Sequence, residues 1–101
     1  EYITIKKTKI WRWSLKEVHV LNSLEEINIV SNPLRLKIIM TLGTSPKNAQ
    51  DLSDALGVIG KDSLALKILE KNNIIEVVDT ELINGITQKY FLPVAKAFIP
   101  N

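Results

Sequence analysis

The chain has 101 residues, of which 46% are hydrophobic and 24% are charged, and its net charge is +2. This length allows one small domain with one hydrophobic core, and the composition is that of an ordinary globular protein. No apolar run approaches the roughly 20 residues that a membrane-spanning helix needs, and no secretory leader is recognisable. Cysteine is absent, which excludes disulfide bonds and cysteine-ligated zinc. We therefore expect a cytoplasmic protein that does not span a membrane.

Positive charge is concentrated near the N-terminus. Residues 1–16 carry five basic side chains and one acidic side chain, whereas residues 17–101 carry eight basic and ten acidic ones. We therefore divide the chain into a basic, aromatic N-terminal strand segment (1–16) and a slightly acidic domain (17–101). Phosphate contacts supply much of the affinity for nucleic acid, so the uneven charge bears directly on function.

Within the N-terminal segment, Ile3 and Ile5 alternate with polar residues, which predicts a strand with one covered face. Cations and aromatic residues follow: Lys6, Lys7, Lys9, Trp11, Arg12 and Trp13. One interpretation is a basic arm that lies along a phosphate backbone. The favoured interpretation is that the tryptophans bury against the domain or a second subunit, because exposed tryptophan is costly.

Residues 17–21 predict a short strand that contains the only histidine, His19. We interpret His19 as a packing or surface residue, because no second ligand for a metal ion is in view. The first helix is predicted to begin after Ser23, with Glu26 completing a capping box. Its inward face is expected to hold Leu24, Ile27 and Val30 or Ser31.

Three further helices are marked by their end signals. Asn32 and Pro33 predict the start of a helix that ends at Gly43. Asn48, answered by Asp51, predicts the next helix, which ends at Gly57. Asp62 or Ser63 is expected to cap the last helix, which reaches about Asn72. The pair Asn72 and Asn73 is the signal for its end. The predicted core residues are Leu34, Ile38, Leu52, Leu56, Leu66, Leu69 and Val77. Arg35 is predicted to bind a carboxylate or carbonyl group of the domain.

Asn84 and Gly85 form a strong signal for a β-hairpin. A two-residue turn predicts that Ile83 pairs with Ile86, Thr80 with Lys89, and Val77 with Leu92. Pro93 is expected to stop further pairing. The tail after it either docks through Phe98 or frays.

Three stretches, 31–39, 52–57 and 66–75, resemble the helices of ArsR-type winged-helix regulators of archaea and bacteria. The resemblance covers a little over half of the chain. It implies an α+β, mainly α fold: a winged helix-turn-helix with three to four helices and a hairpin wing, preceded here by the N-terminal strand segment. It also implies a DNA-binding transcriptional regulator that acts as a homodimer.

For that function we expect Lys61, Ser63 and Lys67 to lie in the DNA groove and Lys47 and Lys89 to approach flanking phosphates. Lys6, Lys7, Lys9 and Arg12 would form an outlying basic arm. The homodimer would be joined through residues 2–13 or through the helix that begins after Ser23. The partners expected are thus double-stranded DNA and a second copy of the chain.

An alternative function is a winged-helix protein-interaction module within a larger assembly, without DNA readout. Apolar residues at the predicted wing tip favour a protein contact there. This surface would comprise Leu82, Ile83, Ile86, Trp11 and Trp13. The sequence contains no catalytic pair, phosphate-binding loop or ligand cluster, so we expect neither an enzyme nor a cofactor or metal site.

Overall fold

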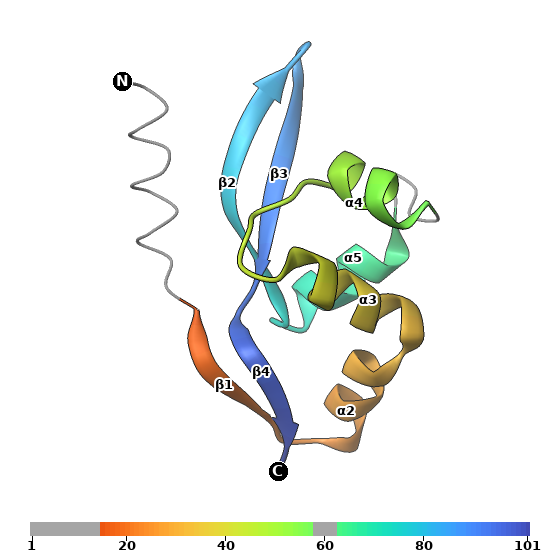
Figure 1. Ribbon diagram of the computed structural model, residues 1–101, viewed down its shortest axis with the longest axis vertical. Coiled ribbons are helices and arrows are strands. Elements are labelled where there is room, and N and C mark those ends of the chain that lie inside the picture. Colours follow the sequence, from red (N-terminus) through yellow and green to blue (C-terminus); the bar gives the residue numbers. More distant parts are fainter. Residues whose placement is uncertain (1–14, 58–62) are drawn as a thin grey trace.

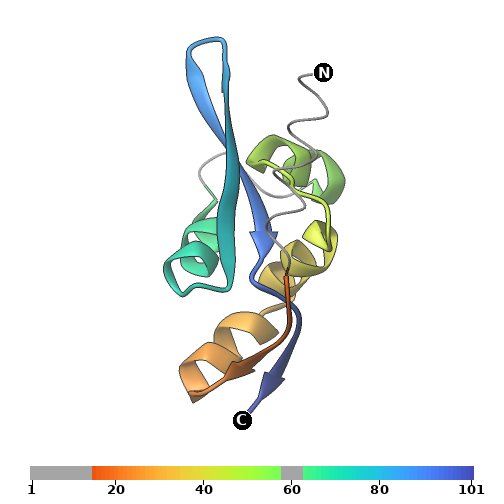
Figure 2. The ribbon, with the colours of Figure 1, turned by 90° about the vertical axis from the view of Figure 1, so that its left-hand side faces the viewer.

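The computed structural model describes residues 15–57 and 63–101. These residues form an α+β domain with four helices and an antiparallel hairpin, which agrees with the predicted fold class (Figure 1). In chain order the elements are β1 (Lys16–Leu21), α2 (Leu24–Ser31), α3 (Pro33–Leu42), α4 (Ala49–Leu56), α5 (Leu64–Lys71), β2 (Ile75–Ile83), β3 (Ile86–Pro93) and β4 (Ala95–Pro100). Figures 1 and 2 show the β2–β3 hairpin extending past the helices at one end, and β1 and β4 beside α2 at the other.

The core lies between the helices and the base of the hairpin. Ile38, Leu42, Leu52, Leu69 and Ile74 are fully buried there. Of the predicted core residues, Ile38, Leu52, Leu66 and Leu69 are buried, and Leu34, Leu56 and Val77 are partly buried against the same cluster. Burial of apolar side chains from all four helices and from the adjoining strands holds these short helices in place, since isolated helices of this length are unstable in water.

Helix α2 differs from the prediction at two points. The Ser23 side chain caps the helix by accepting from the backbone N–H of Glu26 (3.1 Å), but the Glu26 carboxylate accepts from Asn22 (2.7 Å) rather than from Ser23. The predicted inward face is correct at Val30, which is buried, and at Ile27, which is partly buried against the core, but wrong at Leu24, which is 73% exposed. Ile29, which was not predicted, is the other buried residue, so the start of this eight-residue helix at Leu24 projects into solvent.

Arg35, near the start of α3, has the structural role predicted for it. Its Nε atom donates to the carbonyl oxygen of Ile29 (2.7 Å), and Nη2 donates to that of Asn28 (3.5 Å). Both carbonyl groups belong to the last turn of α2, where the final C=O groups of a helix have no partner within it. Arg35 therefore closes the C-terminal end of α2 and joins it to α3.

The other predicted helix ends are confirmed. Asn48 and Asp51 form a complete capping box at α4, and Ser63 is the N-cap of α5. Asp62, the alternative cap, lies outside the described residues. The chain leaves α5 through Asn73, whose φ of +60° lies in the left-handed region that asparagine tolerates.

The hairpin is confirmed with one change of register. Ile83 pairs with Ile86 and Thr80 with Lys89, as predicted, across a turn in which both residues have positive φ (Asn84 +51°, Gly85 +78°). Val77, however, pairs with Phe91 and not with Leu92, because the register shifts between Val77 and Asp79. The extra residue, Val78, makes a bulge and is buried.

The C-terminal tail docks and does not fray. Pairing in the hairpin continues to Pro93, opposite Ile75, and the chain then forms β4 after Val94. Strand β4 pairs in parallel with β1, which places His19 opposite Phe98. The two rings contact edge to face at 5.6 Å, and Phe98 packs against the core. The tail therefore ties both ends of the described domain together.

Candidate interaction cleft

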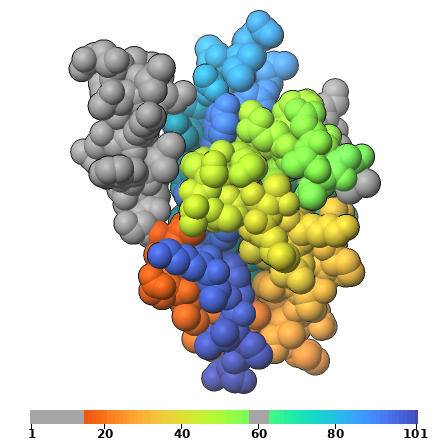
Figure 3. Space-filling view, viewed as in Figure 1, coloured from red at the N-terminus to blue at the C-terminus, as the bar shows by residue number. Residues whose placement is uncertain are grey.

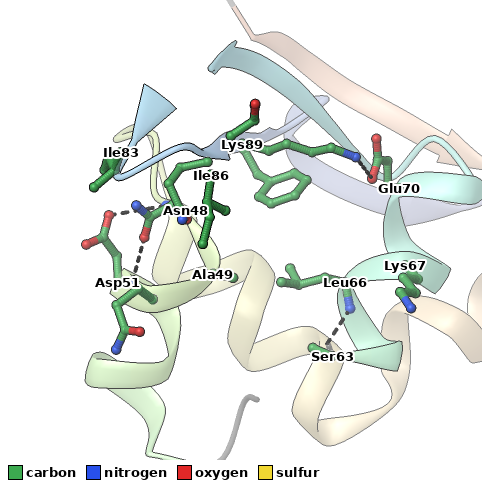
Figure 4. Close-up of a pocket in the computed structure, with 14 residues that line it drawn as sticks. Asn48, Ala49, Asp51, Ser63, Leu66, Lys67, Glu70, Ile83, Ile86 and Lys89 are labelled. Carbon is green, nitrogen blue, oxygen red and sulfur yellow. Dashed lines mark hydrogen bonds and ion pairs between the residues drawn. The ribbon is translucent and has the colours of Figure 1, made fainter. Parts of the chain in front are cut away.

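A cleft of about 630 Å³ separates the upper hairpin from the start of α4 and the exposed side of α5 (Figure 4). Three elements that are distant in the sequence meet here because α4 and α5 pack against the base of the hairpin. The cleft is lined by Asn48, Ala49, Gln50, Asp51, Ser63, Leu66, Lys67, Glu70, Ile83, Ile86, Thr87, Gln88, Lys89 and Phe91.

The α4 wall is built on the capping box. The Asn48 side chain accepts from the backbone N–H of Asp51 (2.7 Å), and the Asp51 carboxylate accepts from the backbone N–H of Asn48 (3.2 Å). Asn48 is the one buried polar residue among the described residues. Its side chain is therefore used to hold the helix, and it is fixed in position rather than free to rotate.

Next to this wall, the Tyr90 hydroxyl donates to Oε1 of Glu81 at 2.7 Å, across the β2–β3 ladder. This hydrogen bond is the largest cause of a raised pKa for Tyr90, followed by burial and by the negative charge of Glu81. A hydrogen bond with the Asn48 side chain has the opposite effect and lowers the pKa of Tyr90, but by a smaller amount. Tyr90 thus stays neutral at physiological pH and acts as a donor that stiffens the hairpin.

The α5 wall carries Lys67 and Glu70, and Lys89 of β3 faces it. Ser63 accepts from the N–H of Leu66 (3.3 Å), so its hydroxyl oxygen is engaged in capping. Lys67 is exposed, whereas the Lys89 ammonium lies 4.0 Å from the Glu70 carboxylate, across the gap between β3 and α5. Such an exposed pair contributes little to stability, but it reduces the positive charge that β3 presents.

The hairpin wall is apolar at the tip, where Ile83 and Ile86 line the cleft, and the polar residues Thr87, Gln88 and Lys89 follow along β3. Ile83 and Ile86 lie beside the start of α4 in Figure 4, and Ile86 is 63% exposed. Leu82, next to them, is 71% exposed and does not line the cleft. The space-filling view shows this tip standing clear of α4 (Figure 3).

The structure brings together some of the residues predicted to bind DNA. Ser63, Lys67 and Lys89 line the cleft, but Lys47 does not. The backbone of Lys47 pairs with Phe91, and its ammonium group donates to the carbonyl oxygen of Ser45 (3.4 Å). The other predicted residues lie outside the described residues: Lys6, Lys7, Lys9, Arg12 and Lys61, together with Trp11 and Trp13 of the alternative interface.

Several lining residues were not predicted, among them Gln50, Thr87 and Gln88. The capping box at Asn48 fixes where α4 begins, and the two-residue turn fixes which β3 residues stand near the tip. Combining these two signals would have suggested that the upper part of β3 faces the start of α4. The distance between these segments and α5 depends on how the helices pack, and no local sequence pattern encodes that packing.

Charge in the cleft is balanced. Two carboxylates, Asp51 and Glu70, stand against two ammonium groups, Lys67 and Lys89. The described residues as a whole carry eight basic and nine acidic side chains. The cleft by itself therefore has no strong electrostatic attraction for phosphate.

Residues 15–57 and 63–101 contain no group of three or more histidine, cysteine or acidic residues placed to hold a metal ion. No helix among them has the length and apolar character required to cross a membrane. Comparison of the sequence with models of known protein families finds no match, and comparison with curated protein sequences finds none either.

Proposed function

We propose that this domain is a winged helix-turn-helix of the ArsR type that binds double-stranded DNA in a transcriptional regulator. The observation that carries the proposal is the placement of α5. This helix follows α4 in the chain and lies at the base of a long hairpin, as a reading helix lies beside a wing. Its buried side, Ala65, Leu66 and Leu69, packs on the core, which leaves the opposite side open.

In the proposed complex, the first turns of α5 enter the major groove. Leu64 and Lys67 are exposed on that side, and Leu64 is suited to contact a thymine methyl group. Lys67 would contact a phosphate or a base edge. Since Lys89 is paired with Glu70 and the cleft is electrically balanced, most of the attraction to phosphate would come from Lys6, Lys7, Lys9, Arg12 and Lys61.

We further propose that the regulator acts as a homodimer, since two reading helices would contact two half-sites of a symmetric operator. The strand-rich segment of residues 2–13, with Trp11 and Trp13, is the proposed contact, and the helix that begins after Ser23 is the alternative. Sedimentation equilibrium at high micromolar concentration tests this proposal. A monomer under those conditions would exclude the homodimer.

Fluorescence anisotropy with a labelled random duplex tests DNA binding. We expect binding that weakens at least about tenfold between about 50 and about 200 mM salt, because phosphate contacts release counterions. Lys67→Ala should weaken binding and lower the salt slope by about one. The matched control is Lys96→Ala, which removes the same charge from β4, where Lys96 pairs with Glu17 at 3.2 Å. Equal losses in both variants would mean that α5 is not the contact.

The basic N-terminal arm gives a second test with the same measurement. Deleting residues 1–12 should flatten the salt dependence more than Lys61→Ala does, because the arm carries more of the surplus positive charge. Circular dichroism must show that the deletion leaves the fold intact. Loss of binding in Lys61→Ala alone, with the arm deletion silent, would assign the contact to the helix and reject the charge argument.

The exposed hairpin tip favours a second candidate, a protein-interaction module without DNA readout. Leu82, Ile83 and Ile86 expose aliphatic surface where a wing that contacts DNA would be expected to carry cations. Failure of the parent protein to bind duplex at low salt would favour this candidate. Leu82→Ser and Ile86→Ser would then be the first substitutions to test against a protein partner.

A further inference from the structure

The backbone of β3 alternates between its two edges. A two-residue turn makes Ile83 and Ile86 a hydrogen-bonded pair, so the backbone groups of Ile86, Gln88 and Tyr90 point toward β2. The backbone groups of Thr87, Lys89 and Phe91 then point away from β2, toward the opposite edge of β3. The contacts of Phe91 agree with this assignment, because its N–H donates to the carbonyl of Lys47 (2.9 Å) and its carbonyl accepts from the N–H of Lys47 (3.3 Å).

Lys47 thus occupies the first position of an additional antiparallel strand on β3. The chain does not continue that strand, because Asn48 caps α4 and the next residues turn into the helix. The backbone groups of Thr87 and Lys89 consequently make no hydrogen bond to another described segment. Both residues line the cleft, so the unfilled strand positions open into a cavity rather than onto a flat surface.

The opposite edge of the hairpin is different. On β2, the backbone N–H of Thr80 donates to the side chain of Asp79 (2.8 Å), and the bulge at Val78 interrupts the ladder. Bulges and local capping of this kind protect an edge strand from further pairing. Strand β3 carries neither a bulge nor a proline between Ile86 and Leu92. The unprotected edge is therefore the one that faces the cleft.

We propose that this edge of β3 accepts an extended segment of another protein, which adds an antiparallel strand in continuation of Lys47 and pairs with Thr87 and Lys89. Addition of a peptide strand to an open sheet edge is an established way for proteins to bind. The four lining charges balance, so the paired part of the segment is uncharged. Leu66, Ile83, Ile86 and Ala49 supply apolar contacts, so its side chains are aliphatic.

The partner is a different protein and not a second copy of the described domain. Each of the four described strands is already paired, β1 with β4 and β2 with β3. A second copy could offer only an edge of its own hairpin, and neither edge fits: its β2 edge is interrupted by the bulge at Val78, and its β3 edge lies in the cleft between its own α4 and α5. The proposal concerns a protein ligand and holds whether or not the domain also binds DNA, so a failure of the duplex titration leaves it standing.

Two proline substitutions in the full chain test the proposal. The probe is a short blocked peptide of alternating threonine and valine residues. Thr87→Pro removes the outward N–H of β3 and should weaken peptide binding at least about tenfold, because a backbone hydrogen bond is lost and its acceptor is left unpaired. Thr80→Pro is the matched control, since Thr80 pairs with Lys89 but its N–H points out of the opposite edge, where it donates to the side chain of Asp79. It should change binding by less than about twofold.

Hydrogen exchange in the parent protein provides a readout that does not depend on the variants. Peptide should slow exchange of the Thr87 and Lys89 amides at least about tenfold and leave the Leu82 amide unchanged. The proposal is overturned if the parent does not bind the peptide, or if Thr87→Pro and Thr80→Pro bind it equally. It is also overturned if unlabelled protein, added in place of the peptide, protects the same two amides, because a second copy would then be the partner.

Discussion

The base of the domain and the tip of its hairpin use the same kind of residue in opposite environments. At the base, Ile38 and Leu69 are fully buried in a core formed by the four helices and the adjoining strands. At the tip, Leu82 and Ile86 are mostly in solvent. Folding requires the first pair and gains almost nothing from the second, which is why the interaction proposed above is placed at the tip.

The largest expected effect comes from breaking the base. Leu69→Ala should lower the free energy of unfolding by about 2–5 kcal/mol, because it removes buried methyl groups and leaves a cavity. Ile86→Ala, the matched change at the tip, should alter it by less than about 0.5 kcal/mol. Urea unfolding followed by circular dichroism measures both. A large loss of stability in Ile86→Ala would show that the tip is packed in solution. The contrast between a buried base and an exposed tip would then be wrong.

The next effect concerns the joint between α2 and α3. Arg35→Met keeps most of the side-chain length but removes the donors to the carbonyl oxygens of Ile29 and Asn28. We expect a loss of about 1.5–3 kcal/mol, as for hydrogen bonds that involve a charged group. Lys37→Met, an exposed position on the same helix, serves as the control. Equal stability of the two variants would show that the Arg35 hydrogen bonds are not formed in solution.

What the sequence could predict was local. Asn48 with Asp51, Asn32 with Pro33, and Asn84 with Gly85 each encode their structure within a few residues, and the structure has all three. The bulge at Val78 escaped prediction because Val77 and Val78 look alike in sequence. The parallel pairing of β1 with β4 escaped it because those strands are more than 70 residues apart in the sequence, and no local signal joins them.

The cleft was predicted less completely than the fold. Lys67 and Lys89 were expected at a binding surface and both line it, but the pairing of Lys89 with Glu70 depends on the distance between β3 and α5. The role of Lys47 was also missed. Its side chain suggested a phosphate contact, whereas its backbone forms the bridge to Phe91. Side-chain chemistry alone does not reveal which residues act through their backbone.

A smaller effect is expected at the wall of the cleft. Asn48→Ala should cost about 0.5–2 kcal/mol, because it removes the cap of α4 and leaves the N–H of Asp51 unpaired. Ser63→Ala, at the start of α5, should cost less, because Ser63 makes a single longer capping bond and is less buried. Urea unfolding of both variants shows which of them loses more stability. The reverse order would mean that the α5 cap, and not the α4 box, secures this side of the hairpin.

The smallest effect appears only at high pH and concerns the stiffness of the hairpin near its tip. The hydrogen bond to Glu81 raises the pKa of Tyr90 above its ordinary value of 10.0 in the folded state. A raised pKa means that folding favours the neutral phenol, so the stabilisation is complete below about pH 10 and is lost as the pH rises through the folded-state pKa. Tyr90→Phe should therefore be less stable than the parent by up to about 1 kcal/mol near pH 8, and the difference should shrink near pH 11. The comparison isolates Tyr90 because all other ionisable groups are common to both proteins. Urea unfolding of both proteins at the two pH values gives the result, and a difference that stays constant between them would show that the Tyr90–Glu81 hydrogen bond does not stabilise the hairpin.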